Sequence, residues 1–139
     1  MIIYIDENLP PQLAKGLQIL QDPLNVGIPT PIQVLSIKKK FGQGAKDEDW
    51  IPKAGEEGAI IITQDYRIQT TRHQLALYQE YELGIFFFTA PSKGGYSYWE
   101  MVEQVIKRWT ELKKLAFKTD RPFAYRCNAR SSKFEIINQ

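Results

Sequence analysis

Two short apolar runs that lead into acidic residues constrain the fold of this chain most. Residues 2–5 read Ile-Ile-Tyr-Ile and lead into Asp6, and residues 59–63 read Ala-Ile-Ile-Ile-Thr and lead through one residue to Asp65. A continuous apolar run of this length is typical of a strand buried on both faces of a parallel sheet. Ligands bind beyond the carboxyl ends of the strands in open α/β sheets. The pattern therefore predicts that Asp6 and Asp65 lie side by side at such an edge.

The rest of the chain alternates between helical and extended patterns. Helices are expected over residues 12–20, 47–57, 68–82 and 97–117, and further strands over residues 32–37 and 85–88. Two apolar segments near the end, 123–125 and 134–137, form a late hairpin or lie over the domain. The alternation implies right-handed crossovers and a parallel sheet. We expect the second and third strands to flank the first, which places the topological switch point between Asp6 and Asp65.

Size and composition indicate one domain that does not span a membrane. The chain has 139 residues, a net charge of +2 and one cysteine, Cys127. The small net charge argues neither for nor against a nucleic-acid partner. A lone cysteine excludes an intramolecular disulfide, no apolar run approaches the roughly 20 residues of a membrane span, and the N-terminus lacks signal-peptide features. We expect a cytoplasmic protein with a domain over residues 1–117 and a basic extension over residues 118–139, packed on it or trailing from it.

The pair of strand-end acids predicts a metal site. Two converging carboxylates repel each other unless a proton or a cation lies between them. Hard divalent cations such as Mg²⁺ or Mn²⁺ take carboxylate oxygens and keep several waters. A third acid from the cluster at residues 47–49, Asp-Glu-Asp, would complete the site. Such a site positions a metal ion against a phosphodiester and activates water.

The helical phase of residues 47–57 favours one acid of this cluster. Asp47 lies on the same side of the helix as the apolar Ile51, Glu48 is the second choice, and Asp49 points away as a good N-cap. An alternative is that all three acids serve only as N-cap and helix-dipole residues.

Two polar residues are candidates for supporting roles. Thr63 stands two residues before Asp65 and so faces the same side of the strand, where its hydroxyl can orient the carboxylate. Asn8 can do the same for Asp6.

Three segments, in this order and spacing, resemble the PIN-like domains. They are Asp-Glu-Asn-Leu-Pro at 6–10, Asp-Glu-Asp-Trp-Ile at 47–51 and Ile-Ile-Ile-Thr-Gln-Asp at 60–65. The match is to the compact prokaryotic branch that often lies beside toxin–antitoxin genes, and it covers roughly the first ninety residues.

The resemblance implies a three-layer α/β/α sandwich with a mainly parallel sheet of four or five strands. It also implies a metal-dependent endoribonuclease, with a toxin role, an antitoxin partner and a homodimer as further expectations. The catalytic residues carried over are Asp6, Asp47 and Asp65, and the Mg²⁺ or Mn²⁺ ligands are Asp6, Asp47, Glu48 and Asp65.

One departure from the family pattern opens two other interpretations. PIN nucleases usually carry a fourth acid shortly after the position of Asp65, where this chain has Tyr66, Arg67 and Ile68. A two-metal site is therefore disfavoured, and a non-catalytic PIN-like module that binds RNA or protein is an alternative. A receiver-like phosphoacceptor domain is a third interpretation, although the expected lysine after a fifth strand is absent from the pattern.

Basic residues provide candidates for RNA binding, through phosphate contacts beside aromatic rings in the extension. They are Lys38, Lys39, Arg67, Arg121, Arg126 and Arg130. The lysines have the simpler interpretation of a strand end in water. We expect His73 on a helix surface and the three tryptophans, Trp50, Trp99 and Trp109, in the core.

Overall fold

The sheet of this protein contains five parallel strands and one antiparallel edge strand. The computed structural model describes residues 1–131 and 133–137, and within them the strand order is β2-β1-β3-β4-β5-β6. The strands are β1 Ile2–Ile5, β2 Gln33–Ser36, β3 Ile60–Thr63, β4 Gly84–Thr89, β5 Phe123–Asn128 and β6 Glu135–Ile136. Strands β1 to β5 pair in parallel, and β6 runs antiparallel to β5.

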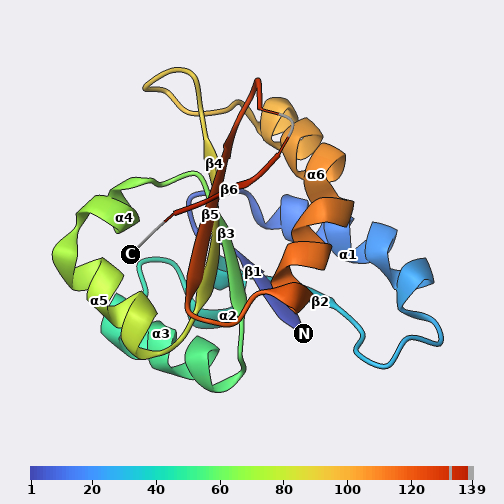
Figure 1. Ribbon diagram of the computed structural model, residues 1–139, viewed down its shortest axis with the longest axis horizontal. Coiled ribbons are helices and arrows are strands. Elements are labelled where there is room, and N and C mark those ends of the chain that lie inside the picture. The colour runs from blue at the N-terminus through green and yellow to red at the C-terminus, as the bar shows by residue number, and fades with distance from the viewer. Residues whose placement is uncertain (132, 138–139) are drawn as a thin grey trace.

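Helices cover both faces of the sheet, so the predicted α/β/α sandwich is confirmed. Helices α3, α4 and α5 cover one face, and α1 and α6 cover the other (Figure 1). The helices are α1 Pro11–Asn25, α2 Ile37–Phe41, α3 Asp47–Glu56, α4 Arg67–Thr70, α5 Arg72–Glu80 and α6 Tyr98–Lys118.

The central strands divide their side chains between two apolar cores. Ile3 and Ile5 of β1 pack with α1 and α6, whereas Tyr4 packs with α3 and α5. Strand β3 has the same alternation, because Ile60 and Ile62 face α1 and α6. Side chains of successive strand residues point to opposite faces. By this alternation Asp6, Thr63 and Asp65 lie on the α3/α5 side, and the fold thereby gathers three polar residues on one face.

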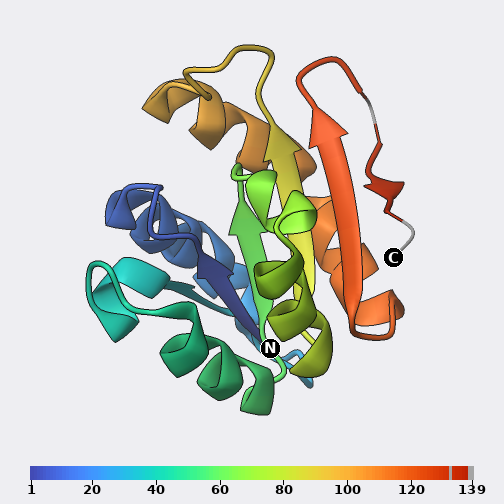
Figure 2. The same ribbon diagram turned by 90° about the vertical axis from the view of Figure 1, so that its left-hand side faces the viewer.

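The switch point lies where the sequence predicts it. Strand β1 lies between β2 and β3, with Ile5 opposite Ile62, and the amide of Asp6 donates to the carbonyl of Ile62 over 3.0 Å. Figure 2 shows the arrowheads of β3, β4 and β5 directed to the same edge of the sheet. The two acids therefore leave neighbouring strands at their carboxyl ends.

The sheet has six strands within the described residues, so the predicted count of four or five is wrong. Residues 123–128 pair with β4 along its whole length, and residues 135–136 then pair with β5 as the predicted hairpin. The extension therefore packs on the domain as part of its sheet, and a boundary at residue 117 stays a prediction. Residues 132, 138 and 139 of the extension lie outside the described residues.

Two helix predictions differ from the structure. Helix α1 continues to Asn25 through Pro23, and in this added part the buried Gln21 accepts a hydrogen bond from Trp109 of α6. The predicted helix 68–82 divides into α4 and α5 at Thr71, whose backbone is extended.

Residues 38–40 do not end a strand in water as predicted. They form α2, which the Ser36 hydroxyl caps by accepting from the amide of Lys39 over 3.3 Å. Within the part of the chain that the structure describes, none of the helices has the length and apolar character to cross a membrane. Two of the three tryptophans are buried as expected, but Trp99 is 67% exposed on α6, so that prediction is wrong.

Candidate active site at the carboxyl edge of the sheet

Thr63 joins the ends of β1 and β3. Its hydroxyl donates to Oδ2 of Asp6 over 2.7 Å and accepts from the backbone amide of Asp65 over 2.9 Å. The threonine is fully buried. The expectation that it orients the Asp65 carboxylate is wrong in detail, because the carboxylate that it contacts is that of Asp6.

Asp6 is held by hydrogen bonds in a largely buried position. The amide of Glu7 donates to Oδ1 over 2.8 Å, and Thr63 holds Oδ2. Burial raises the pKa of Asp6, the two hydrogen bonds oppose that rise, and the nearby charge of Asp65 adds to it. Among the described residues, Asn8 makes no hydrogen bond to Asp6, so the supporting role predicted for Asn8 is taken by the Glu7 amide.

Asp47 reaches the same place from the first turn of α3. Its Oδ1 accepts from Nε1 of Trp50 over 3.2 Å, and its Oδ2 accepts from Nε2 of Gln74 over 3.0 Å. Helix α3 begins at Asp47 with Lys46 as its N-cap, so the predicted capping role of Asp49 is wrong. The predicted helical phase holds, because Asp47 faces inward while Glu48 and Asp49 are exposed.

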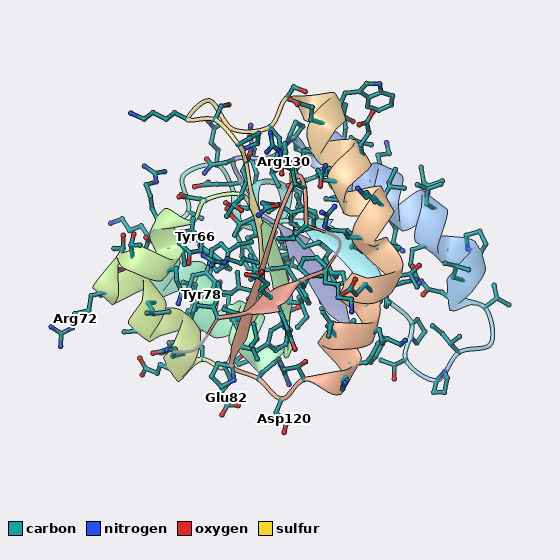
Figure 3. The ribbon with its side chains drawn as sticks, turned by 45° about the horizontal axis from the view of Figure 1, so that its top comes forward. Tyr66, Arg72, Tyr78, Glu82, Asp120 and Arg130 are labelled. Carbon is teal, nitrogen blue, oxygen red and sulfur yellow. The ribbon has the colours of Figure 1, made fainter. Side chains whose placement is uncertain are left out.

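The three aspartates line one small hollow, which we call the carboxylate pocket. Its volume is about 70 Å³, and its lining includes Asp6, Glu7, Asp47, Asp65, Gln74 and Tyr78. Figure 3 shows Tyr78 between α5 and the sheet. The pKa of the Tyr78 hydroxyl lies well above its ordinary value, first because of burial and then because of the charges of the three aspartates. The three charges therefore converge on one buried hydroxyl.

Two residues of this pocket have no role in the sequence-based prediction. Gln74 and Tyr78 lie one helical turn apart on α5, at a spacing that places both on one face. That spacing could have identified them. Glu7 also lines the pocket, although the strand pattern places it opposite Asp6, because the chain turns after β1 and Oε2 of Glu7 accepts from the amide of Gly44 over 3.0 Å.

Asp65 forms an ion pair at the rim of the pocket. Nε of Arg67 lies 2.8 Å from Oδ1 of Asp65, and Nη2 lies 2.9 Å from Oδ2. This two-point contact lowers the pKa of the Asp65 carboxyl. Glu48, the second choice from the acidic cluster, lies outside the pocket lining and is paired with exposed His73 over 2.9 Å.

The carboxylates are the right donors for a hard cation, but they are not arranged as a finished site. In residues 1–131 and 133–137, no group of three His, Cys, Asp or Glu side chains stands close enough to hold a metal ion. Each of the three aspartates in the pocket has a protein partner: Thr63 for Asp6, Gln74 for Asp47 and Arg67 for Asp65. Metal binding would require rotation of at least one of these side chains.

The predicted RNA-binding residues are divided between the two edges of the sheet. Lys38 and Lys39 follow β2 on α2, and Arg130, labelled in Figure 3, follows β5. From their places in the sequence, all three lie toward the carboxyl edge. Arg121 precedes β5, and its guanidinium lies against Gly58 before β3. Its position at the amino edge contradicts a direct role beside the carboxylate pocket.

Arg126 is exposed on β5 and contacts Tyr66 and Glu135. Its Nη1 donates to the hydroxyl of Tyr66 over 3.4 Å, and its Nε lies 3.6 Å from Oε2 of Glu135.

A larger hollow adjoins the carboxylate pocket. We call it the loop hollow. Its volume is about 590 Å³, and its lining includes Asn8, Asp65, Arg67, Thr89, Lys93 and Gly94. Because Asn8 and Asp65 line both hollows, the two lie side by side. The combined surface brings cations close to the acidic residues.

The comparison with known families agrees with this geometry. A family model described as a PIN like domain matches residues 1–90 of the 139 residues. The chain belongs to the PIN-like domain family. The matched part of this PIN-like domain contains β1 to β4 and all the acids of the carboxylate pocket. No curated protein and no solved structure matches the chain.

Proposed function

We propose that this PIN-like domain is a metal-dependent endoribonuclease that hydrolyses RNA phosphodiesters at the carboxylate pocket. One observation carries the proposal: Asp6, Asp47 and Asp65 come from three different elements and line one pocket of about 70 Å³ at the switch point. Family membership supports a nuclease-type fold. The receiver-like alternative loses its basis, because the matched family is a different one.

The donor set suits Mg²⁺ or Mn²⁺ in its chemistry. Oxygen ligands from carboxylates are those that hard divalent cations prefer. Asp6 is buried beside another carboxylate, and its raised pKa reflects the unfavourable free energy of that charge. A bound divalent cation would supply charge neutralisation and a more acidic water for attack on phosphorus.

The protein side chains would orient the ligands. Thr63 holds one oxygen of Asp6, leaving the direction of that carboxylate fixed relative to β3. Trp50 and Gln74 hold both oxygens of Asp47. Hydrogen bonds of this kind to metal-binding carboxylates commonly strengthen metal affinity. Glu48 is not a proposed ligand in this arrangement, because its carboxylate is exposed and paired with His73.

The biological role remains as the family resemblance predicts it. RNA is the proposed substrate. A role as the toxin of a toxin–antitoxin pair, with an antitoxin partner or a homodimer, and a cytoplasmic location stay predictions.

A second function is favoured by the ion pair at Asp65. With both oxygens of Asp65 in contact with Arg67, the domain would act as a non-catalytic module that binds RNA or protein. The absence of an assembled three-ligand group within the described residues also favours this alternative.

Calorimetric titration with Mn²⁺, combined with cleavage of single-stranded RNA, separates the two functions. The nuclease proposal expects binding and cleavage by the wild type, and neither by a folded Asp65→Asn variant. Asp49→Asn is the matched control, because Asp49 is an exposed acid of α3 outside the pocket lining. RNA binding that persists in EDTA, without cleavage, would establish the second function instead.

A further inference from the structure

The contact between Arg67 and Asp65 joins an exposed cation to a sheltered acid. The side chain of Arg67 is 81% exposed, whereas that of Asp65 is 18% exposed. The guanidinium contacts both carboxylate oxygens, and the backbone amide of Arg67 also donates to Oδ1 over 3.1 Å. A cation thus occupies the face of Asp65.

This ion pair can be exchanged at small free-energy cost. Arg67 is 81% exposed, so solvent screens its charge, and holding its long side chain in one position costs conformational entropy. A divalent cation at Asp65 would repel the guanidinium at the same oxygens. Moving Arg67 away from Asp65 would therefore favour metal binding at this carboxylate, and the exposure of Arg67 leaves it free to move.

The loop hollow offers the guanidinium a second position. Arg67 lines this hollow together with Lys93, on the side of Asp65 away from Asp6 and Asp47. Tyr66 also lines this hollow, and its hydroxyl accepts a hydrogen bond from Arg126. Arginine binds phosphate oxygens with the same two-point geometry that it uses with a carboxylate. An RNA phosphate in the loop hollow would accept Arg67 while remaining next to the carboxylate pocket.

We propose that Arg67 exchanges between Asp65 and an RNA phosphate in the loop hollow, so that RNA binding frees Asp65 for the metal ion. This inference rests on the proposed nuclease function. It makes metal and RNA binding mutually dependent: each ligand displaces Arg67 from the position that hinders the other. Such coupling is reciprocal, and each ligand strengthens the binding of the other by the same factor.

The test measures Mn²⁺ affinity by calorimetry with and without a single-stranded 2′-O-methyl oligouridylate, whose integrity is checked by electrophoresis. For the wild type we expect the oligonucleotide to tighten Mn²⁺ binding about tenfold, within the usual range of such couplings. For Arg67→Gln we expect Mn²⁺ alone to bind about tenfold more tightly than to the wild type, and the oligonucleotide to have little further effect.

Arg72→Gln is the control for charge. It removes one positive charge from an exposed residue of α5 whose side chain points away from the sheet in Figure 3, and it should match the wild type. Thermal melts verify that each variant folds.

Unchanged or weaker Mn²⁺ binding by Arg67→Gln, in a protein whose wild type binds Mn²⁺ and cleaves RNA, would overturn the exchange and leave the nuclease proposal intact. Failure of the wild type to bind Mn²⁺ at millimolar concentration, with or without the oligonucleotide, would overturn both.

Discussion

The hydroxyl of Thr63 lies 2.7 Å from Oδ2 of Asp6 and donates a hydrogen bond to that carboxylate. This bond links the last residue of β3 to the first residue after β1. The hydroxyl oxygen of Thr63 also accepts a hydrogen bond from the backbone amide of Asp65. One buried hydroxyl therefore fixes the backbone of Asp65 and the side chain of Asp6. The relative placement of two carboxylates thus depends on a neutral residue between them.

Replacement of Thr63 by valine tests this dependence. Valine keeps the β-branched shape but removes the hydroxyl, leaving a carboxylate oxygen and a backbone amide without their partner. We expect the free energy of unfolding to fall by about 1–3 kcal/mol. Urea denaturation measures the change, and Thr63→Ser, which retains the hydroxyl, should recover most of it. A Thr63→Val variant as stable as the wild type, with a loss in Thr63→Ser, would show that the methyl group, not the hydroxyl, matters.

The raised pKa of Asp6 predicts a pH-dependent effect of Asp6→Asn on stability. Because the folded-state pKa lies above the ordinary value of 3.8, the folded protein binds this proton more tightly than the unfolded chain. The resulting stabilisation is complete below pH 3.8 and is lost as pH rises through the folded-state pKa. The variant should therefore gain stability relative to the wild type across this window and keep that gain at neutral pH.

Urea denaturation of both proteins at several pH values, without divalent metal, measures the difference. Asp49→Asn should show no comparable gain. A difference that does not change with pH would contradict the raised pKa.

Gln74 should influence metal binding through Asp47. Substitution of Gln74 by leucine removes the amide that donates to Oδ2 of Asp47 but retains a side chain of similar size. We expect Mn²⁺ affinity to fall about tenfold, the lower end of the effect seen when a partner of a metal ligand is removed. Calorimetry provides the measurement. Gln43→Leu, in an exposed loop, is the control.

Gln21 should stabilise the packing of α1 on α6. Its Oε1 accepts from Nε1 of Trp109 over 2.9 Å and from Nζ of Lys113 over 3.0 Å. Replacement by leucine leaves a buried indole N–H without a partner, so we expect unfolding to become easier by about 1–3 kcal/mol. Adding Trp109→Phe removes that orphaned donor. The double variant should therefore lose less than the sum of the two single variants in urea denaturation.

The central position of β1 and β3 in the sheet was predictable because their side chains are apolar on both faces. Residues 2–5 and 60–63 are apolar on both faces, which permits only interior positions in a helix-covered sheet. The place of β5 was not predictable in the same way. In the sequence, the whole of α6 separates β5 from its neighbour β4. In addition, exposed Arg126 alternates with buried Tyr125 and Cys127 along β5, a pattern that resembles a strand at a solvent-facing surface.

The site was predictable where periodicity determines direction. Asp47 follows from the phase of α3, and the approach of Asp6 to Asp65 follows from the strand order. Contacts between side chains of different elements were not predictable, since they depend on angles and distances that no local pattern encodes. The pair formed by Arg67 and Asp65 is an intermediate case, because the two residues are close in sequence but their contact depends on the turn into α4.

The alternation of side chains along β1 and β3 makes the site sensitive to the parity of residue number. Tyr4 and Asp6 share a face, as do Ile61, Thr63 and Asp65, since each step is of two residues. Insertion of a single residue between Tyr4 and Asp6 would turn the acid toward α1 and α6, even if the sheet re-formed. Insertions in the loop at residues 26–31 would leave this count unchanged. Such a chain therefore tolerates insertions in its loops. An odd number of residues inserted into β1 or β3 would instead move the acids to the wrong face of the sheet.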